Sequence, residues 1–244
     1  MVPDVIRLAV EGATRSAEDR ALDAGREPAK TLAFFEIAPG QRVAELAAGG
    51  GYTAELLARI VGQKGEVYAQ NSPFILRRFA AAPWSARLQK PEMANVARLD
   101  RDFDDPLPPN VTGLDAVLLV LFYHDTVWFE IDRDRMNRAV YAALAPGGVY
   151  GIVDHAAAPG AGVSVAESLH RIEESTVVAE VTRAGFELDA RGTFLQNPED
   201  SRDWNASPRS AGERRGTSDR FALRFRKPRS PAVTAEMRAP ADTW

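Results

Sequence analysis

From residue 42 onward, short apolar runs alternate with longer segments that are apolar along one side only. Short runs predict β-strands and the longer segments predict amphipathic helices, a pattern typical of βα units around a parallel sheet. The run 114–122 is almost continuously apolar, which indicates a central strand covered on both faces. The run 221–225 alternates strictly, which favours an antiparallel strand. The expected strands are 43–46, 66–70, 95–99, 114–122, 149–153, 186–188 and 221–225.

The expected helices carry apolar residues at helical spacing. Pro146-Gly147-Gly148 stops one of them, and Gly185 caps another. Residues 13–40 predict a helix with a charged face, followed after Pro28 by a second short helix. The remaining expected helices are one directly after the first strand, one over 131–145 and one long helix over 165–183.

Together these elements predict an α/β fold. We expect a seven-stranded, mostly parallel Rossmann-like sheet with helices on both faces and an antiparallel last strand. The sheet domain spans residues 41–228, and residues 1–40 form an N-terminal helical cap. Residues 229–244 predict a flexible C-terminal tail, because the chain after Pro228 is rich in Pro, Ala and Arg and poor in core-forming residues.

A glycine cluster directly follows the first expected strand. Glu45 lies near the end of this strand, and Gly49, Gly50 and Gly51 come before the next helix. Because glycine has no Cβ, it adopts positive φ and lets the backbone come within van der Waals reach of a ligand. The segment therefore predicts a nucleotide-cofactor loop.

This loop resembles motif I of the class I S-adenosylmethionine-dependent methyltransferases. In that family an acid ends the first strand and glycines contact the methionine part of the cofactor. Glu45, Gly49 and Gly51 fall on the pattern, and Ala47 replaces its first glycine. The Pro-Gly-Gly turn before the fifth strand and the terminal hairpin strands are similar too, so the resemblance covers about residues 40–228.

More narrowly, three short segments resemble a group of bacterial predicted small-molecule methyltransferases. They are Tyr123-His124-Asp125, Asp154-His155 and His170-Arg171. The resemblance implies S-adenosyl-L-methionine as the methyl donor and S-adenosyl-L-homocysteine as the product.

Cofactor contacts follow from the resemblance position by position. Glu45 stands near the ammonium of the methionine moiety, beside Ala47, Gly49, Gly51 and Tyr52 of the loop.

The nucleoside contacts come after the second and third strands. Asn71 stands where the family usually has an acid that accepts both ribose hydroxyls, whereas an amide accepts only through its oxygen. Asp102 stands where an acid receives the adenine amino group, with Asp100 as its rival, and Phe103 stands where an apolar residue packs against the ring.

Two of the three histidines follow strands of the expected sheet. His124 and His155 lie at the carboxyl ends of strands four and five, where ligands bind in open α/β sheets, and His170 lies on the next helix. A histidine accepts a proton from an acceptor hydroxyl, amine or thiol near neutral pH. His124, beside Tyr123 and Asp125, is the first candidate for base or substrate orienter, and His155 is the second. The alternative is a loop histidine that is satisfied by backbone.

A metal site is a less favoured alternative. Catechol-type O-methyltransferases are similar in layout and hold magnesium near positions that Asp125, Asp154 and His155 occupy here. Magnesium prefers oxygen ligands, and an added imidazole favours manganese, iron or zinc. We expect no metal.

Composition excludes several classes of chemistry. The chain of 244 residues has no cysteine, so disulfides, thiolate zinc sites and cysteine nucleophiles are excluded. Asp4, Arg7 and Glu11 interrupt the N-terminal apolar residues, unlike a secretory signal, and no run of about 18 apolar residues suggests a membrane span. We expect a cytoplasmic protein without a membrane partner.

Charge argues against a nucleic-acid partner. Residues 201–244 hold ten Lys/Arg and five Asp/Glu, but the arginines lie among Ser, Gly and Pro without aromatic interleaving, and the whole chain carries a net charge of -4.

The favoured function is methyl transfer from S-adenosylmethionine to a small-molecule acceptor by in-line displacement, with a histidine as general base. One alternative is a NAD-dependent oxidoreductase, although the chain lacks a clean Gly-x-Gly-x-x-Gly and the ribose acid. Another is a non-catalytic binding protein in which Ala47 and Asn71 mark a decayed cofactor site. The acceptor atom and the formation of a homodimer stay open.

Overall fold

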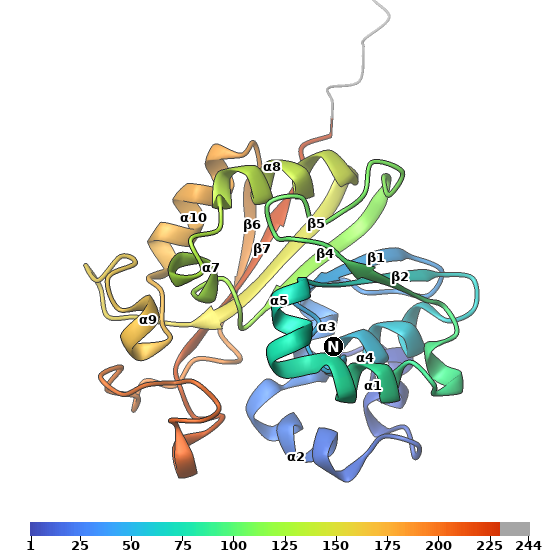
Figure 1. Cartoon of the computed structure of the whole chain (residues 1–244), viewed down its shortest axis with the longest axis horizontal. Helices are drawn as coiled ribbons and strands as arrows, with labels where there is room; N and C mark the ends of the chain where they lie inside the picture. The colour runs from blue at the N-terminus through green and yellow to red at the C-terminus, as the bar shows by residue number, and fades with distance from the viewer. Residues whose placement is uncertain (230–244) are drawn as a thin grey trace, which may run out of the picture.

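The computed structural model describes residues 1–229 and contains one seven-stranded sheet (Figure 1). The strand order is β3-β2-β1-β4-β5-β7-β6, and β7 runs antiparallel to both of its neighbours while the other pairs are parallel. This confirms the predicted fold class. Apart from residue 229, the predicted C-terminal tail lies outside the described residues. The strands are β1 (Arg42–Leu46), β2 (Glu66–Asn71), β3 (Val96–Asp100), β4 (Leu114–Val120), β5 (Leu144–His155), β6 (Glu187–Gly192) and β7 (Arg220–Arg226).

Helices surround this sheet. Helices α2, α3, α4 and α8 lie where the sequence predicts helices, whereas α1, α5, α6 and α7 were not predicted. Over residues 1–229, no helix is both long enough and apolar enough to cross a membrane. The α-helices are α1 (Asp4–Glu11), α2 (Ala17–Arg26), α3 (Pro28–Phe34), α4 (Tyr52–Val61), α5 (Pro73–Ile75), α6 (Ala81–Arg87), α7 (Asp125–Trp128), α8 (Arg133–Ala143), α9 (Ala166–Leu169) and α10 (Glu174–Arg183). A π-helical turn (Leu76–Ala80) and two 3₁₀ turns (Pro91–Met93 and Gly212–Arg214) complete the set.

Both faces of the sheet are covered, as two neighbouring residues of β5 show. Successive residues of a strand point to opposite faces. The hydroxyl of Tyr150 donates to Asn137 of α8 at 3.3 Å, so this face packs against α8. A Cβ on Gly151 would lie 2.7 Å from the ring of Phe35, which directly follows α3. Helices α3 and α8 therefore cover opposite faces at β5.

The predicted long helix over 165–183 is wrong, because the chain breaks between α9 and α10. His170 adopts a left-handed φ of 50°, and Ile172 forms a parallel bridge with Ala156 after β5. Arg171 explains the break: its guanidinium is completely buried, pairs with Asp200 at 2.7 Å and donates to the carbonyl of Ala156 at 3.0 Å. Burial of this charge against the sheet edge draws the segment out of helical geometry.

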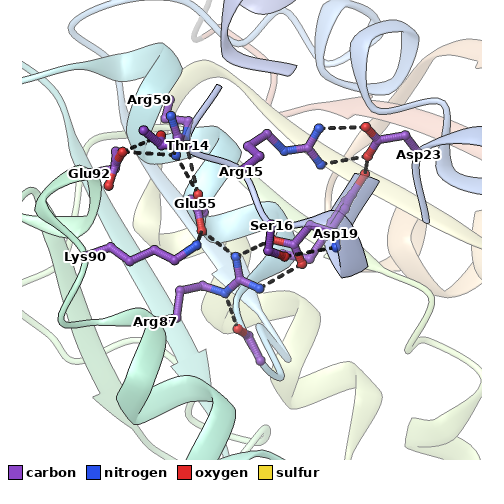
Figure 2. Close-up of polar contacts among 12 residues, drawn as sticks. Thr14, Arg15, Ser16, Asp19, Asp23, Glu55, Arg59, Arg87, Lys90 and Glu92 are labelled. Carbon is purple, nitrogen blue, oxygen red and sulfur yellow. Dashed lines mark hydrogen bonds and ion pairs between the residues drawn. The ribbon is translucent and has the colours of Figure 1, made fainter. Parts of the chain in front are cut away.

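The N-terminal helix α2 is attached to the sheet domain by charged groups (Figure 2). Arg87 of α6 donates to both carboxylate oxygens of Asp19 in α2, at 2.6 and 2.9 Å, and also pairs with Glu55 of α4. Glu55 is 1% exposed and additionally accepts from Lys90 at 2.7 Å. Because Arg87 also donates to the carbonyl of Gly50 at 2.5 Å, the same side chain holds α2 over the glycine loop.

We expect Asp200→Asn to lower the free energy of unfolding by about 3–5 kcal/mol, because it leaves the buried Arg171 without its counter-charge. Urea unfolding followed by circular dichroism measures the change. Asp134→Asn is the matched control: its pair with Arg183 is 42% and 57% exposed, and its loss is expected to cost less than about 1 kcal/mol. Equal losses for the two variants would contradict this account of the α9–α10 break.

Candidate functional site

A cavity of about 400 Å³ lies at the carboxyl ends of β1, β4 and β5, and residues of α2 line it as well. This is where ligands bind in open α/β sheets. Twelve residues were predicted for the site, and seven of them line the cavity: Glu45, Ala47, Gly49, Tyr52, His124, Asp125 and His155. Five others do not line it, namely Gly51, Asn71, Asp102, Phe103 and Tyr123.

The glycine loop has the left-handed backbone that its sequence predicts. Ala47, Gly49 and Gly51 have φ values of 55°, 56° and 84°. A Cβ on Gly51 would clash with the ring of Trp84 and lie 2.7 Å from the side chain of Arg87, so this glycine allows α6 to pack against the loop. Ala47, Ala48, Gly49 and Gly50 line the cavity, whereas Gly51 does not, and its direct cofactor contact stays a prediction.

Asn71 holds the loop rather than facing the cavity. Its amide oxygen accepts from the backbone N–H of Gly49 at 2.7 Å, and its amide nitrogen donates to the carbonyl of the same residue at 3.2 Å. The residue is completely buried. Its predicted contact with a ribose therefore stays a prediction, since both polar groups of the amide are engaged here.

The residues after β3 are separated from the cavity by aromatic packing. Phe103 stacks on Phe122, with ring centroids 4.6 Å apart, and Phe122 is the member of the pair that lines the cavity. Asp102 is exposed. The predicted adenine contacts of Asp102 and Phe103 are untested by this arrangement and stay predictions.

Glu45 at the end of β1 is a buried acid with a free oxygen. It is 3% exposed, and its Oε2 has no hydrogen-bond partner among the described residues. Burial raises the pKa of Glu45 to about 8, although the Thr53 hydroxyl and the charge of Arg26 oppose the rise. A buried acceptor without a partner is costly, so this oxygen is suited to bind a cationic donor.

His124 is fixed by the carboxylate of Asp154. Its backbone N–H donates to one carboxylate oxygen at 2.7 Å, and its ring Nδ1 lies 2.7 Å from the other. Burial lowers the pKa of His124, but the negative charges of Asp154 and Asp125 outweigh burial and raise the pKa to about 10. With nothing bound to it, His124 is therefore protonated near neutral pH. A protonated imidazole cannot act as a general base.

The opposite ring nitrogen of His124 meets two further side chains. Its Nε2 lies 3.2 Å from Nδ1 of His170 and 3.2 Å from Oδ1 of Asp125. His170 was predicted on a helix and without a site role, yet it lines the cavity. The structure thus brings together three side chains with possible ligand atoms from two segments of the chain.

His155 has a different environment and stays neutral. Its Nδ1 lies 2.7 Å from the hydroxyl of Ser218, so Nε2 is the ring nitrogen left for a ligand. Burial, reinforced by the positive charge of Arg220, lowers the pKa of His155 well below its usual value. A neutral imidazole keeps a lone pair, so His155 can accept a proton.

Tyr123 is not brought to the cavity. Its side chain is completely buried on the other side of the backbone, where its hydroxyl donates to Glu180 at 2.9 Å and accepts from Asn137 at 2.9 Å. Its neighbour His124 faces the cavity, so Tyr123 packs against α8 and α10 and contributes no group to this site.

A second cavity of about 220 Å³ shares Arg26, Leu121 and His155 with the first. Its charged lining consists of Arg26, Arg215 and Arg220. Arg220 is 4% exposed, donates to Ser218 at 2.9 Å and to the carbonyl of Gly25, and burial together with the charge of Arg26 lowers its pKa to about 10. Within residues 1–229, no carboxylate lies within 4.0 Å of these three guanidinium groups.

Sequence reasoning did not identify Arg220 or Arg26 as cavity residues; Arg26 lies within the predicted helices of residues 13–40. The strict alternation of 221–225 predicted the strand. It gave no sign that Arg220, the residue before this run, lies toward β5. The sequence did contain a signal for His170, because the segment His170-Arg171 resembles a segment of the predicted small-molecule methyltransferases.

No family model matches the chain. Solved structures nevertheless share its fold at low identity. A SAM-dependent methyltransferase from Aquifex aeolicus is 16% identical, with 86% of this chain and 97% of that chain covered and a TM-score of 0.59. A putative sarcosine dimethylglycine methyltransferase from Galdieria sulphuraria is 16% identical, with 93% and 99% covered and a TM-score of 0.58.

An arsenic(III) S-adenosylmethionine methyltransferase from Chlamydomonas reinhardtii is 17% identical, with 94% of this chain and 75% of that chain covered and a TM-score of 0.57. At these identities the comparison establishes the fold and leaves the chemistry to the site. The chain has the fold of the class I S-adenosylmethionine-dependent methyltransferases.

Proposed function

We propose that the protein transfers a methyl group from S-adenosylmethionine to a small-molecule acceptor that carries an anionic group. The observation that carries the proposal is the unpartnered oxygen of Glu45, buried beside the glycine loop in a cavity that also holds His155. The cytoplasmic, bacterial setting expected from the sequence, without a nucleic-acid or membrane partner, is part of this proposal.

The residues present fit the amino-acid half of the cofactor. Glu45 would accept from its ammonium, while the backbone of Ala47 and Gly49 lies open to the same cavity. When bound, S-adenosylmethionine supplies a methyl group on a positively charged sulfur, which is already activated for displacement. The protein then contributes chiefly alignment of the two reactants.

The second cavity supports the proposal that the acceptor carries an anionic group. A buried guanidinium without a carboxylate is unfavourable, so the buried Arg220, together with the partly buried Arg26, favours a ligand with a negative charge. A carboxylate suits them because guanidinium groups bind it through paired hydrogen bonds. His155 borders both cavities and would accept the proton that an acceptor hydroxyl or amine loses.

One observation favours a second candidate, a protein that binds an amino-acid-like ligand without transferring a methyl group. Asn71 and Phe103 do not line the cavity, so the nucleoside half of the cofactor lacks its expected contacts in this arrangement. A transfer assay with methyl-labelled S-adenosylmethionine and a panel of small carboxylic acids separates the two candidates. Label in product supports transfer, and binding without any label supports the second candidate.

Saturating S-adenosylhomocysteine is expected to raise the melting temperature by about 5–10 °C, because a ligand at a hundred times its Kd stabilises the native state by about 2.7 kcal/mol. Differential scanning fluorimetry measures the shift. Glu45→Gln should lose most of it, whereas Glu187→Gln, an exposed acid on β6, should retain it. A shift with NADH but none with S-adenosylhomocysteine would instead favour the oxidoreductase alternative.

Cofactor affinity is expected to rise with pH between pH 6 and 7.5. With a pKa of about 8, Glu45 is protonated in the free protein, and only its carboxylate attracts an ammonium, so binding must release a proton. The rise approaches tenfold per pH unit at most, and Glu45→Gln should flatten it. Calorimetry in two buffers of different ionisation enthalpy counts the proton, and a pH-independent Kd in the unchanged protein would contradict the assignment.

With S-adenosylhomocysteine bound, the protein is expected to bind benzoate at least about tenfold more tightly than benzamide, because only benzoate carries a charge for the arginines. Arg220→Met should abolish the preference, and Arg220→Lys should keep part of it. Arg214→Met, at an exposed position outside both cavities, is the control. Equal binding of both compounds, measured by ligand-observed NMR, would argue against an anionic acceptor.

A further inference from the structure

Three donor atoms at the cavity wall form a nearly equilateral triangle. Nε2 of His124, Nδ1 of His170 and Oδ1 of Asp125 lie 3.2 Å from one another along each side. The three residues all line the larger cavity. They are the described residues whose ligand atoms cluster closely enough to hold a metal ion.

Hydrogen bonds account for only part of this triangle. Its corners have angles of about 60°, and a hydrogen atom directed along one side does not point along the other, whereas good hydrogen bonds exceed about 150°. At most two of the three contacts can therefore be good hydrogen bonds at once. A divalent ion in place of these hydrogen atoms could bond to all three ligand atoms.

A bound ion accounts for the distances. Transition-metal ions lie about 2.1 Å from imidazole nitrogen and carboxylate oxygen, and neighbouring ligands at tetrahedral or octahedral angles are then about 3.0–3.4 Å apart. We propose that His124, Asp125 and His170 bind one divalent transition-metal ion, with its open coordination positions facing the cavity. This goes beyond the proposed methyl transfer and does not depend on it.

Side chains next to the triangle make the contacts that commonly support metal ligands in proteins. Metal-binding histidines commonly donate their second ring N–H to a carboxylate, which fixes the tautomer. Nδ1 of His124 has this partner in Asp154, which is completely buried, so a metal ion that displaces the other ring proton would bind Nε2. Trp128 donates to the ligating oxygen of Asp125 at 2.8 Å and fixes that carboxylate.

The backbone conformation of His170 is compatible with the triangle. Its φ of 50° lies in the left-handed region, where helices commonly end. This conformation ends α9, follows from the burial of Arg171 against the sheet edge, and places Nδ1 of His170 beside His124 and Asp125.

The donor set selects the metal. Two imidazoles and one carboxylate favour iron, cobalt, zinc or manganese over magnesium and calcium, which prefer oxygen ligands. The set differs from the Asp125, Asp154 and His155 group considered from the sequence. Asp154 is occupied by His124 and by the N–H of His155, and His155 is turned to Ser218, so only Asp125 belongs to both sets.

Such an ion has a chemical use at this position. A bound metal lowers the pKa of a coordinated hydroxyl, so it would help an acceptor to lose its proton. The acceptor hydroxyl would give its proton to His155 or solvent while its oxygen keeps the electron pair.

Untagged protein, freed of metal by chelator and dialysis, is titrated with Zn²⁺, Mn²⁺ and Mg²⁺ by calorimetry, and with Co²⁺ followed by visible absorption. We expect one Zn²⁺ or Mn²⁺ per chain and Mg²⁺ binding at least about 100-fold weaker. His170→Gly keeps the left-handed backbone and removes the ligand, and it should weaken Zn²⁺ binding about 100-fold or more. Asp154→Asn should weaken it about 10–100-fold.

Glu167→Gln on α9 is the control, because this exposed acid neighbours the site in sequence but supplies no ligand. His155→Gln tests the only other histidine, and both controls should stay within about threefold of the unchanged protein. Far-UV circular dichroism confirms the folding of each variant. The proposal is overturned by the absence of stoichiometric Zn²⁺ or Mn²⁺ binding, or by a folded His170→Gly variant that keeps full affinity. Neither result depends on S-adenosylmethionine, so the methyl-transfer proposal is judged separately.

Discussion

Parallel pairing of β1, β4 and β5 is the constraint on which the whole site depends. Val120 pairs with Val153 and Glu45 with Leu118, so these three strands end at the same edge of the sheet. Glu45, His124 and His155 are far apart in sequence, and no local interaction brings them together. The completely buried Leu118 and its neighbours in the central strands maintain the register, because a shift of one residue would turn the apolar side chains to the wrong face.

Buried charges in this molecule fall into two groups. Asp154 is completely buried but accepts two backbone N–H groups and the ring of His124, and Arg171 has Asp200. These charges are satisfied, so they serve the architecture. Glu45 and Arg220 are buried about as deeply without an opposite charge within ion-pair distance among residues 1–229. Arg220 is a buried cation without a counter-charge, and Glu45 is a buried carboxyl that stays protonated for the same reason. Because a folded domain has only about 5–15 kcal/mol of stability, such groups are expected where a ligand completes them.

Much of the fold could be predicted because strands and helices leave periodic signals. The sheet, its antiparallel last strand and the helix after β1 follow from alternation and helical spacing alone. The break at His170 could not be predicted this way, because it depends on Arg171 and Asp200, which are 29 residues apart and leave no periodic trace. The spacing over 165–183 is compatible with a helix, and a tertiary ion pair overrides it.

The candidate site was predictable at the level of position and less so at the level of side-chain direction. Strand ends correctly located Glu45, His124 and His155 at one cavity. Tyr123 and Asn71 were also near strand ends, but the turn after β4 directs Tyr123 to α8, and the amide of Asn71 bonds to Gly49. A sequence pattern predicts which face of the sheet a strand residue points to. The direction of residues at and just beyond a strand end depends on the turn that follows, and that turn depends on contacts formed only in the folded protein.

Under the proposed methyl transfer, the two cavities imply that the anionic group that anchors the acceptor differs from the atom that reacts. An oxygen held between guanidinium groups has its lone pairs engaged in charged hydrogen bonds, so it attacks a methyl group poorly. The nucleophile must therefore lie away from Arg220, toward the part of the cavity where His155 meets the triangle of His124, Asp125 and His170. Attack by an atom that has lost its proton on a sulfonium neutralises both charges, and a site shielded from water strengthens the attraction between them. Under this proposal, the arginines would determine which acceptors enter, and the groups at the ends of β4 and β5 would determine which atom reacts.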